Sequence, residues 1–226
     1  MIRKEMIYLK MELSNTRKFK IFYVLLIIIL CLFLISCKDN KGNTKIDEDI
    51  TYDNTIFPEE MKGAIKDKKV YITSIGQSQD ATEYKEIVLD NTSYFEYVLD
   101  NLLKASDVEE GACVFLFVGC SIKALAASEL TIDDELSRAK DYVELAKSKK
   151  ITLICFHIGG LSRRGATSDQ FIKALFPYSS MNIYLDSGNS DKLLSSLSND
   201  NKIPCYEISS KLALDRTTAI LCGKEE

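Results

Sequence analysis

Residues Ala112 to Val118 read ACVFLFV, an unbroken apolar run dominated by β-branched and aromatic side chains. A strand that is apolar at every position is buried on both faces, which is typical of the centre of a parallel sheet. The run ends abruptly at Gly119 and a polar turn, as a buried strand does at the edge of its sheet. This segment therefore predicts a parallel sheet with helices on both faces.

Further apolar runs on either side of this segment predict the other strands. They are residues 70–74 (VYITS), 95–99, 151–156 (ITLICF), 181–185 (MNIYL) and 203–208. Between them, apolar residues recur at helical spacing in 81–91, 136–146, 170–176 and 192–198, and a helical turn follows the last strand. Thr131, with Asp134 three residues later, is a capping signal for the longest helix. The alternation predicts a three-layer α/β domain, flavodoxin-like or Rossmann-like, with a mostly parallel sheet.

Charge and cysteine spacing exclude several classes of protein. The 226 residues have a formal net charge of −4, whereas nucleic-acid binders usually have a basic surplus, so we expect no nucleic-acid partner. No CxxC or zinc-type spacing occurs among the seven cysteines. Cys113 and Cys155 lie inside apolar strand patterns, where a free thiol behaves as a small hydrophobe. We therefore expect no disulfide framework, no metal centre and no cofactor.

The N-terminus has the pattern of an export signal. A basic segment precedes residues 21–35, an uncharged apolar run that is short for a membrane span of about 20 residues. Leu34 to Cys37 (LISC) resembles the lipobox of bacterial lipoproteins, which implies cleavage before Cys37 and its diacylation. Two acyl chains hold a protein stably at a bilayer. An uncleaved signal anchor is the alternative, and either would place the domain on the extracytoplasmic face of the cytoplasmic membrane.

This pattern divides the chain into three parts. We expect residues 1–36 to be a lipoprotein signal peptide and residues 37–68 to be the lipidated cysteine with a polar, flexible tether. Residues 69–226 form the single α/β domain in this prediction, and Phe57 and Met61 can dock onto its edge.

Ligands of parallel α/β sheets bind at the carboxyl ends of the strands, so the residues just past each strand are the candidates. They are Ser74, Gly76, Gln77 and Ser78 after the first strand, Gly119, Ser121 and Lys123 after the central one, His157, Gly159, Gly160, Arg163 and Arg164 after the next, and Asp186 after the fifth. We expect them to form one site for a small polar or anionic ligand. Glycine and serine let the backbone approach a ligand, and Lys123 with one arginine would supply countercharge. Arg163 could equally pair with Asp169 and brace its loop.

His157 is the only histidine of the chain. At a strand end it could act as a general base, because its unperturbed pKa is about 6.5. The sequence has no GxSxG elbow and no HExxH segment, so a structural or ligand-binding histidine is the favoured interpretation. A metal site is less favoured still, because the chain has no recognisable set of metal ligands.

Four segments resemble an uncharacterised family of exported bacterial proteins, a domain of unknown function found mostly in Firmicutes. They are ITSIGQSQD (72–80), VGCSIKALAAS (118–128), DDELSRAK (133–140) and HIGGLSRRGATSDQF (157–171). The resemblance covers about Lys69 to Ile208 and implies a secreted or lipid-anchored α/β domain. In that family the loop after the central strand is richer in glycine, reading like GGSSKGLGAAG. The present loop keeps Lys123 but has lost those glycines, which argues against a backbone cradle there.

Three functional hypotheses follow. The first is a lipid-anchored extracytoplasmic protein that binds a small polar or anionic ligand at the carboxyl edge of its sheet. The second is an envelope hydrolase or transferase that uses His157 with Ser74, Ser121 or Asp186. The third is an interaction module that binds a protein partner in the membrane and has no small-molecule site.

Overall fold

Six parallel strands form the centre of the computed structural model, which describes residues 56–148 and 150–224. The strands are β1 (Val70–Ile75), β2 (Tyr97–Leu99), β3 (Cys113–Val118), β4 (Thr152–His157), β5 (Met181–Leu185) and β6 (Cys205–Ile208). They pair in the order β2-β1-β3-β4-β5-β6, and every pairing is parallel. The predicted α/β class is confirmed, and β3 lies in the interior of the sheet as its apolar sequence predicts.

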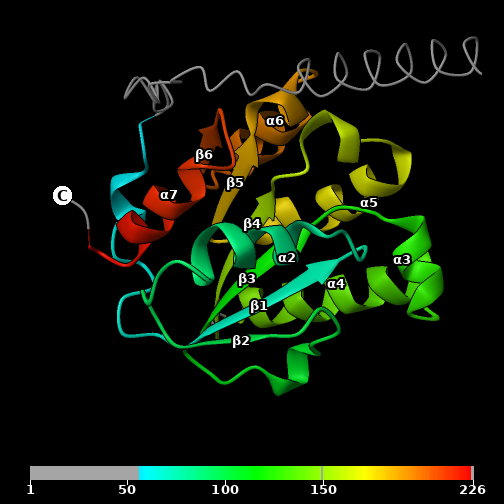
Figure 1. The fold of residues 1–226 in the computed structure, drawn as a ribbon. Helices are drawn as coiled ribbons and strands as arrows, with labels where there is room; N and C mark the ends of the chain where they lie inside the picture. The colour runs from blue at the N-terminus through cyan, green and yellow to red at the C-terminus, as the bar shows by residue number, and fades with distance from the viewer. Residues whose placement is uncertain (1–55, 149, 225–226) are drawn as a thin grey trace, which may run out of the picture. The chain divides into compact units, whose positions relative to one another are not determined.

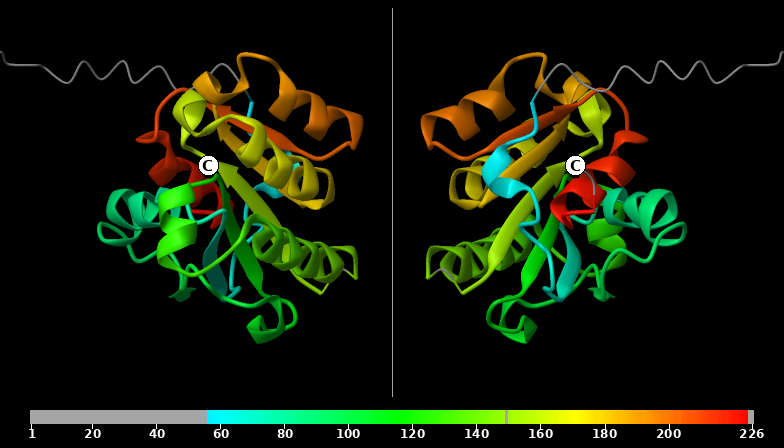
Figure 2. Two further views of the ribbon diagram at one scale, coloured as in Figure 1. Left: turned by 90° about the vertical axis from the view of Figure 1, so that its right-hand side faces the viewer. Right: turned by 90° about the vertical axis from the view of Figure 1, so that its left-hand side faces the viewer.

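Helices cover both faces of the sheet. They are α2 (Asp80–Tyr84), continued by the π-helical η2 (Lys85–Leu89), then α3 (Ile122–Ala127), α4 (Ile132–Lys147), α5 (Ala166–Leu175), α6 (Leu193–Asp200) and α7 (Ala213–Leu221). Short 3₁₀ turns are η1 (Glu59–Met61), η3 (Ala105–Asp107), η4 (Gly160–Arg163), η5 (Phe176–Tyr178) and η6 (Asp186–Asn189). In Figure 1, α2 and α7 lie on one face and α4 on the other. The side views in Figure 2 show the three layers, with α5 and α6 on the same face as α4.

Two apolar layers separate the helices from the sheet. The layer under α2 and α7 contains stacked aromatic rings, with centroids of Phe117 and Phe156 4.8 Å apart and Tyr84 against both. The layer under α4 and α5 is built from Leu116, Leu153 and their neighbours. Because residues 51–226 form one compact unit with both layers inside it, this part of the chain can fold alone.

The first described residues pack onto this domain. Phe57 and Met61 are buried, and Gly63 N and Ile65 N donate to Ile220 O and Leu221 O at 2.9 and 3.1 Å. The folded part therefore begins before Lys69. The predicted signal peptide, Cys37 and most of the tether lie outside the described residues.

Local sequence signals explain most element ends. Thr131 and Asp134 form the predicted capping box at the start of α4. Helix α3 was not predicted, and it begins where Ser121 Oγ accepts a hydrogen bond from Ala124 N. Helix α5 begins four residues earlier than the apolar spacing indicates, because Gly165, at φ +135°, turns the chain before Ala166.

Candidate functional site

The loop after β1 leads to α2 on one face of the sheet, and the loop after β3 leads toward α4 on the opposite face. Open α/β sheets usually bind their ligands between two loops that diverge in this way. The backbones of these two loops are joined to each other: Ser121 N donates to Gly76 O at 2.8 Å, and Gly119 N donates to Ile75 O at 3.1 Å. Gly76 has a φ of +88°, and a Cβ at this position would lie 2.4 Å from Gly119 O. Only glycine fits there, so the two loops are held in a fixed relation at the carboxyl edge.

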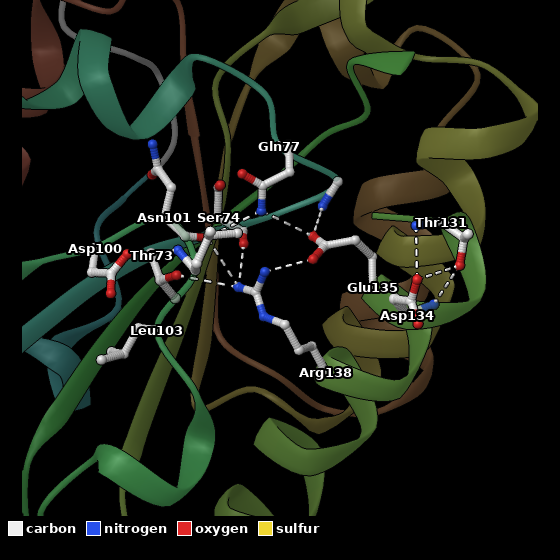
Figure 3. Close-up of polar contacts among 12 residues, drawn as sticks. Thr73, Ser74, Gln77, Asp100, Asn101, Leu103, Thr131, Asp134, Glu135 and Arg138 are labelled. Atoms are coloured by element: carbon white, nitrogen blue, oxygen red, sulfur yellow. Dashed lines mark hydrogen bonds and ion pairs between the residues drawn. The ribbon is translucent and has the colours of Figure 1, made fainter. Parts of the chain in front are cut away.

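A buried ion pair on α4 fixes the loop after β1 (Figure 3). Glu135 Oε2 accepts hydrogen bonds from Gly76 N at 2.6 Å and from Gln77 Nε2 at 3.4 Å. Glu135 Oε1 lies 2.5 Å from Arg138 Nη1, and Arg138 Nη2 donates to Ser74 O at 2.8 Å. Gln77, a predicted ligand residue, is therefore engaged in this network. Glu135 and Arg138 were missed as organising residues, although a Glu and an Arg three positions apart in a helix were the available signal.

Polar atoms of Ser78, Asp80 and His157 gather beside these loops. All three residues are buried, and Ser78 Oγ, Asp80 Oδ2 and His157 Nε2 make no hydrogen bond of good geometry in the described part of the chain, although the Ser78 hydroxyl lies close enough to Asp80 to influence its pKa. Ser78 Oγ and Asp80 Oδ2 each lie 3.3 Å from where a Cβ of Gly119 would be, and Asp80 Oδ2 lies 3.2 Å from that of Gly159. The glycines therefore leave no side chain over the carboxylate.

The single histidine is held in one tautomer. His157 Nδ1 lies 2.9 Å from Val118 O, and a carbonyl only accepts, so we assign the proton to Nδ1. Burial lowers the pKa of His157, although the Val118 carbonyl, the Asp80 carboxylate and the nearby backbone of Gly160 act in the opposite direction. The ring is therefore neutral near pH 7, and its Nε2 is an acceptor. A Cβ at Gly188 would lie 3.2 Å from Nε2, so glycine faces this atom too.

Asp80 begins α2 and is 1% exposed. Burial raises the pKa of its carboxyl, while His157, the Ser78 hydroxyl and Lys211 partly offset that rise. A buried carboxyl with one oxygen unpaired is a feature that functional sites share. Asp80, the last residue of the ITSIGQSQD segment, was not among the predicted ligand residues, although an acidic residue that opens a helix after a strand was the signal for it.

The two arginines of the loop after β4 have different roles. Arg164 Nε donates to Asp169 Oδ1 at 2.7 Å, and its Nη2 donates to Asp191 Oδ2 at 2.8 Å. Its Nη1 also donates to Gly188 O. The Arg164 guanidinium lowers the pKa of Asp191 to about 2. A brace between Arg163 and Asp169 was the alternative to ligand binding, but Arg164 makes that contact. Arg163 instead packs its aliphatic carbons against Gly159.

The remaining predicted residues separate into those near the cluster and those at its rim. Ser74 Oγ is buried without a partner, and Gly160 packs against Ser187 and Gly188. Ser121 caps α3, whereas Lys123 and Asp186 are exposed. The cluster is thus formed by Ser78, Asp80 and His157 with glycines around them. The cationic residues predicted for the site either lie outside the cluster or are already paired.

Cys120 lies past the end of β3, and its thiol is half-buried. Burial and the nearby Glu135 raise its pKa, so it is a neutral thiol near pH 7 and a weak nucleophile. Within residues 56–148 and 150–224, no three His, Cys, Asp or Glu residues lie close enough together to hold a metal ion.

This arrangement defines an α/β domain of the doubly wound type with a buried polar cluster at its topological switch point. Residues 67–219 match the sequence model of the family described as domain of unknown function (DUF6305), and the chain belongs to that family. No curated protein and no solved structure matches it. Among the residues that the structure describes, no helix is long and apolar enough to cross a membrane.

Proposed function

We propose that this domain is carried on the extracytoplasmic face of the membrane by a lipid on Cys37 and binds a small polar ligand at the carboxyl edge of its sheet. The observation that supports binding is the convergence of Ser78, Asp80 and His157, whose buried polar atoms have no partner in the described residues. Buried polar groups are rarely left unpaired, since each costs about 1–3 kcal/mol. A ligand that supplies the missing hydrogen bonds recovers that free energy.

The chemistry of these atoms selects the ligand class. His157 Nε2 is an acceptor because Nδ1 carries the proton, and an ionised Asp80 accepts at Oδ2. The Ser78 hydroxyl can donate or accept. The complementary ligand therefore carries several hydrogen-bond donors, as polyols, sugars and amines do.

An anion is less well supported than a neutral or cationic polar molecule. Arg164 is already paired with Asp169 and Asp191, and Lys123 is exposed on α3. Asp80 would repel an anion in the centre of the cluster. Arg163, whose aliphatic carbons pack against Gly159, is a cation beside the cluster that can pair with a carboxylate or phosphate on one end of the ligand.

Binding is also better supported than hydrolysis by a serine nucleophile. Such catalysis requires a base in hydrogen-bonding reach of the hydroxyl. His157 Nε2, Ser74 Oγ and Ser78 Oγ have no hydrogen-bond partners, so none of these serines is bonded to the histidine in the described residues.

Access to the cluster requires movement of the loop after β4. Gly159 lies against Asp80 Oδ2, and Gly160 lies against Gly188 beside His157. The turn η4 begins at Gly160, where φ is +57°. Glycines at both positions allow this turn to change its backbone angles at little cost.

The ligand is identified by a thermal-shift screen of residues 51–226 with polyols, sugars, amines and amino acids, followed by nucleotides and organic acids. Binding to the native state raises stability by about 2.7 kcal/mol at a hundredfold excess over Kd. We expect a hit to be lost in Asp80→Asn and His157→Gln. Asp186→Asn is the control, because Asp186 is exposed at the same edge. A hit that all three variants retain would place the ligand elsewhere.

Membrane attachment is tested on the full chain. Cys37→Ser should leave the protein in the soluble fraction after export, because no acyl chain can be added. Cys31→Ser is the matched control and should remain with the membrane. Retention of the Cys37→Ser protein would instead indicate an uncleaved signal anchor.

A further inference from the structure

A pocket of about 560 Å³ lies at the amino-terminal edge of the sheet, away from the polar cluster at the carboxyl edge. It is formed by the segment before β1, the segment before β2 and the end of α7. Its lining residues are Ile65, Lys66, Asp67, Lys68, Lys69, Tyr94, Phe95, Glu96, Cys222, Gly223 and Lys224.

The lining is basic although the whole chain has a net charge of −4. Four lysines come from two separate parts of the chain, against the two carboxylates of Asp67 and Glu96. Glu109, outside the lining, forms an ion pair with Lys69 and reduces the surplus of positive charge. The charge that remains lies in one concave surface, which strengthens its local field.

Other contacts position two of these ammonium groups. Lys68 Nζ donates to Thr152 Oγ1 at 2.8 Å, and Lys69 Nζ lies 2.6 Å from Glu109 Oε1. Each ammonium group has three N–H donors, so Lys68 keeps donors for a ligand, whereas Lys69 also interacts with Tyr71.

Lys66 and Lys224 are the most available lysines. Within the described residues, the ammonium group of Lys66 has no hydrogen bond or ion pair, and the side chain is exposed. Lys224 Nζ lies 5.0 Å from the centroid of the Tyr94 ring and 3.4 Å from Ser93 O. The ring holds that ammonium by cation–π attraction without neutralising its charge.

The rest of the wall is uncharged. Ile65 and Phe95 provide an apolar surface, and Cys222 is buried. Burial raises the pKa of the Cys222 thiol to about 11, so it adds no negative charge near pH 7. The pocket can therefore accept the organic part of a ligand as well as its charged group.

We propose that this pocket binds a phosphate group that is esterified to a small organic moiety, either a soluble phosphate ester or the headgroup of an anionic phospholipid. Lysines are compact point charges that bind phosphate, and several of them match its multiple negative oxygens better than they match one carboxylate. The headgroup as a source rests on the membrane attachment proposed above, since anionic lipids attract basic surfaces. This inference does not depend on the ligand proposed for the carboxyl edge.

The experiment measures binding of glycerol 3-phosphate and of inorganic phosphate to residues 51–226 by isothermal titration calorimetry. Flotation with phosphatidylglycerol vesicles, compared with phosphatidylcholine vesicles, tests the lipid. The test variant is Lys66→Gln/Lys224→Gln. The control is Lys140→Gln/Lys173→Gln, which removes the same charge from exposed lysines outside the pocket.

We expect the test variant to bind about thirtyfold more weakly, since each lysine near an anionic group contributes roughly fivefold in affinity. The control variant should bind as tightly as the wild type does, and added salt should weaken the binding of both proteins. Binding of glycerol 3-phosphate would identify a soluble ester as the source, and flotation with phosphatidylglycerol alone would identify the headgroup. Either result supports the proposal if the test variant loses it.

Three results would overturn the proposal. They are no binding to any of these probes, equal binding by the test and control variants, and binding that appears only in Glu225→Gln/Glu226→Gln. Glu225 and Glu226 follow Lys224 in the sequence and lie outside the described residues. The third result would mean that the acidic residues after Lys224 neutralise the lysines in the native protein.

Discussion

Glu135 Oε2 and Gly76 N form a hydrogen bond of 2.6 Å that joins α4 to the loop after β1. Glu135 is fully buried, and its partner Arg138 retains 14% side-chain exposure. Replacing Glu135 with Gln leaves the Arg138 charge without a counterion near the sheet. We expect Glu135→Gln to lower the free energy of unfolding by about 3 kcal/mol, as breaking buried ion pairs does. Urea unfolding of residues 51–226 measures this.

The control for this prediction lies on the same helix. Glu144 and Lys147 form an ion pair with the same spacing of three residues, but both side chains are exposed. Glu144→Gln should change stability by less than about 1 kcal/mol. Similar effects at Glu135 and Glu144 would show that the buried pair does not hold the loop.

Adjacent arginines provide the next comparison. Arg164 bonds to Asp169, Asp191 and Gly188 O, and so joins the loop after β4 to the loop after β5. We expect Arg164→Gln to cost about 2–3 kcal/mol, because charge-assisted hydrogen bonds are lost from a mostly buried side chain. Arg163→Gln should stay within about 0.5 kcal/mol, as surface substitutions usually do. Thermal unfolding of both variants tests this, and a larger effect at Arg163 would contradict it.

The sequence predicted the fold well because its signals are local. The apolar run at 112–118 specifies an interior strand by composition alone, and Thr131 with Asp134 specifies a helix start. The errors fall where tertiary contacts decide. Helix α3, which was not predicted, has only six residues and depends on the cap at Ser121, whereas the short strand expected at 95–99 is present as β2 over three residues at the edge of the sheet. Neither length gives a clear period.

The site was predicted less completely, because pairing across the fold is not visible in a sequence. The strand-end rule placed Ser78 and His157 correctly at one edge. It could not show that Gln77 is engaged by Glu135, or that Arg164 rather than Arg163 is paired with Asp169. The lysines of the amino-terminal pocket belong to segments more than 150 residues apart, so the sequence alone does not show that they lie together.

The buried histidine predicts a pH dependence of stability. Burial lowers the folded-state pKa of His157 below its ordinary value of 6.5, so its contribution to stability is complete above pH 6.5 and is lost as pH falls through the folded pKa. His157→Gln should show a smaller loss of unfolding free energy than the wild type between pH 7 and pH 5. Urea unfolding at several pH values measures the difference. In Asp80→Asn the loss of unfolding free energy should extend to lower pH than in the wild type, because the carboxylate that favours the imidazolium is gone. Parallel plots of unfolding free energy against pH for the wild type and His157→Gln would contradict the prediction.

The Asp80 carboxylate should lower the unfolding free energy of the domain at pH 7, although the proposed ligand requires it. Burial raises its folded-state pKa above the ordinary 3.8, so stability is greatest below about pH 4 and falls as pH rises through the folded pKa. At pH 7 the ionised carboxylate is unfavourable, and we expect Asp80→Asn to raise the unfolding free energy by about 0.5–2 kcal/mol, as substitutions at functional sites often do. The gain should vanish near pH 3, and Asp141→Asn, at an exposed position on α4, should show no such gain. If Asp80→Asn is instead less stable than the wild type at pH 7, the carboxylate is a structural group, and the proposed ligand site at the carboxyl edge loses its main support.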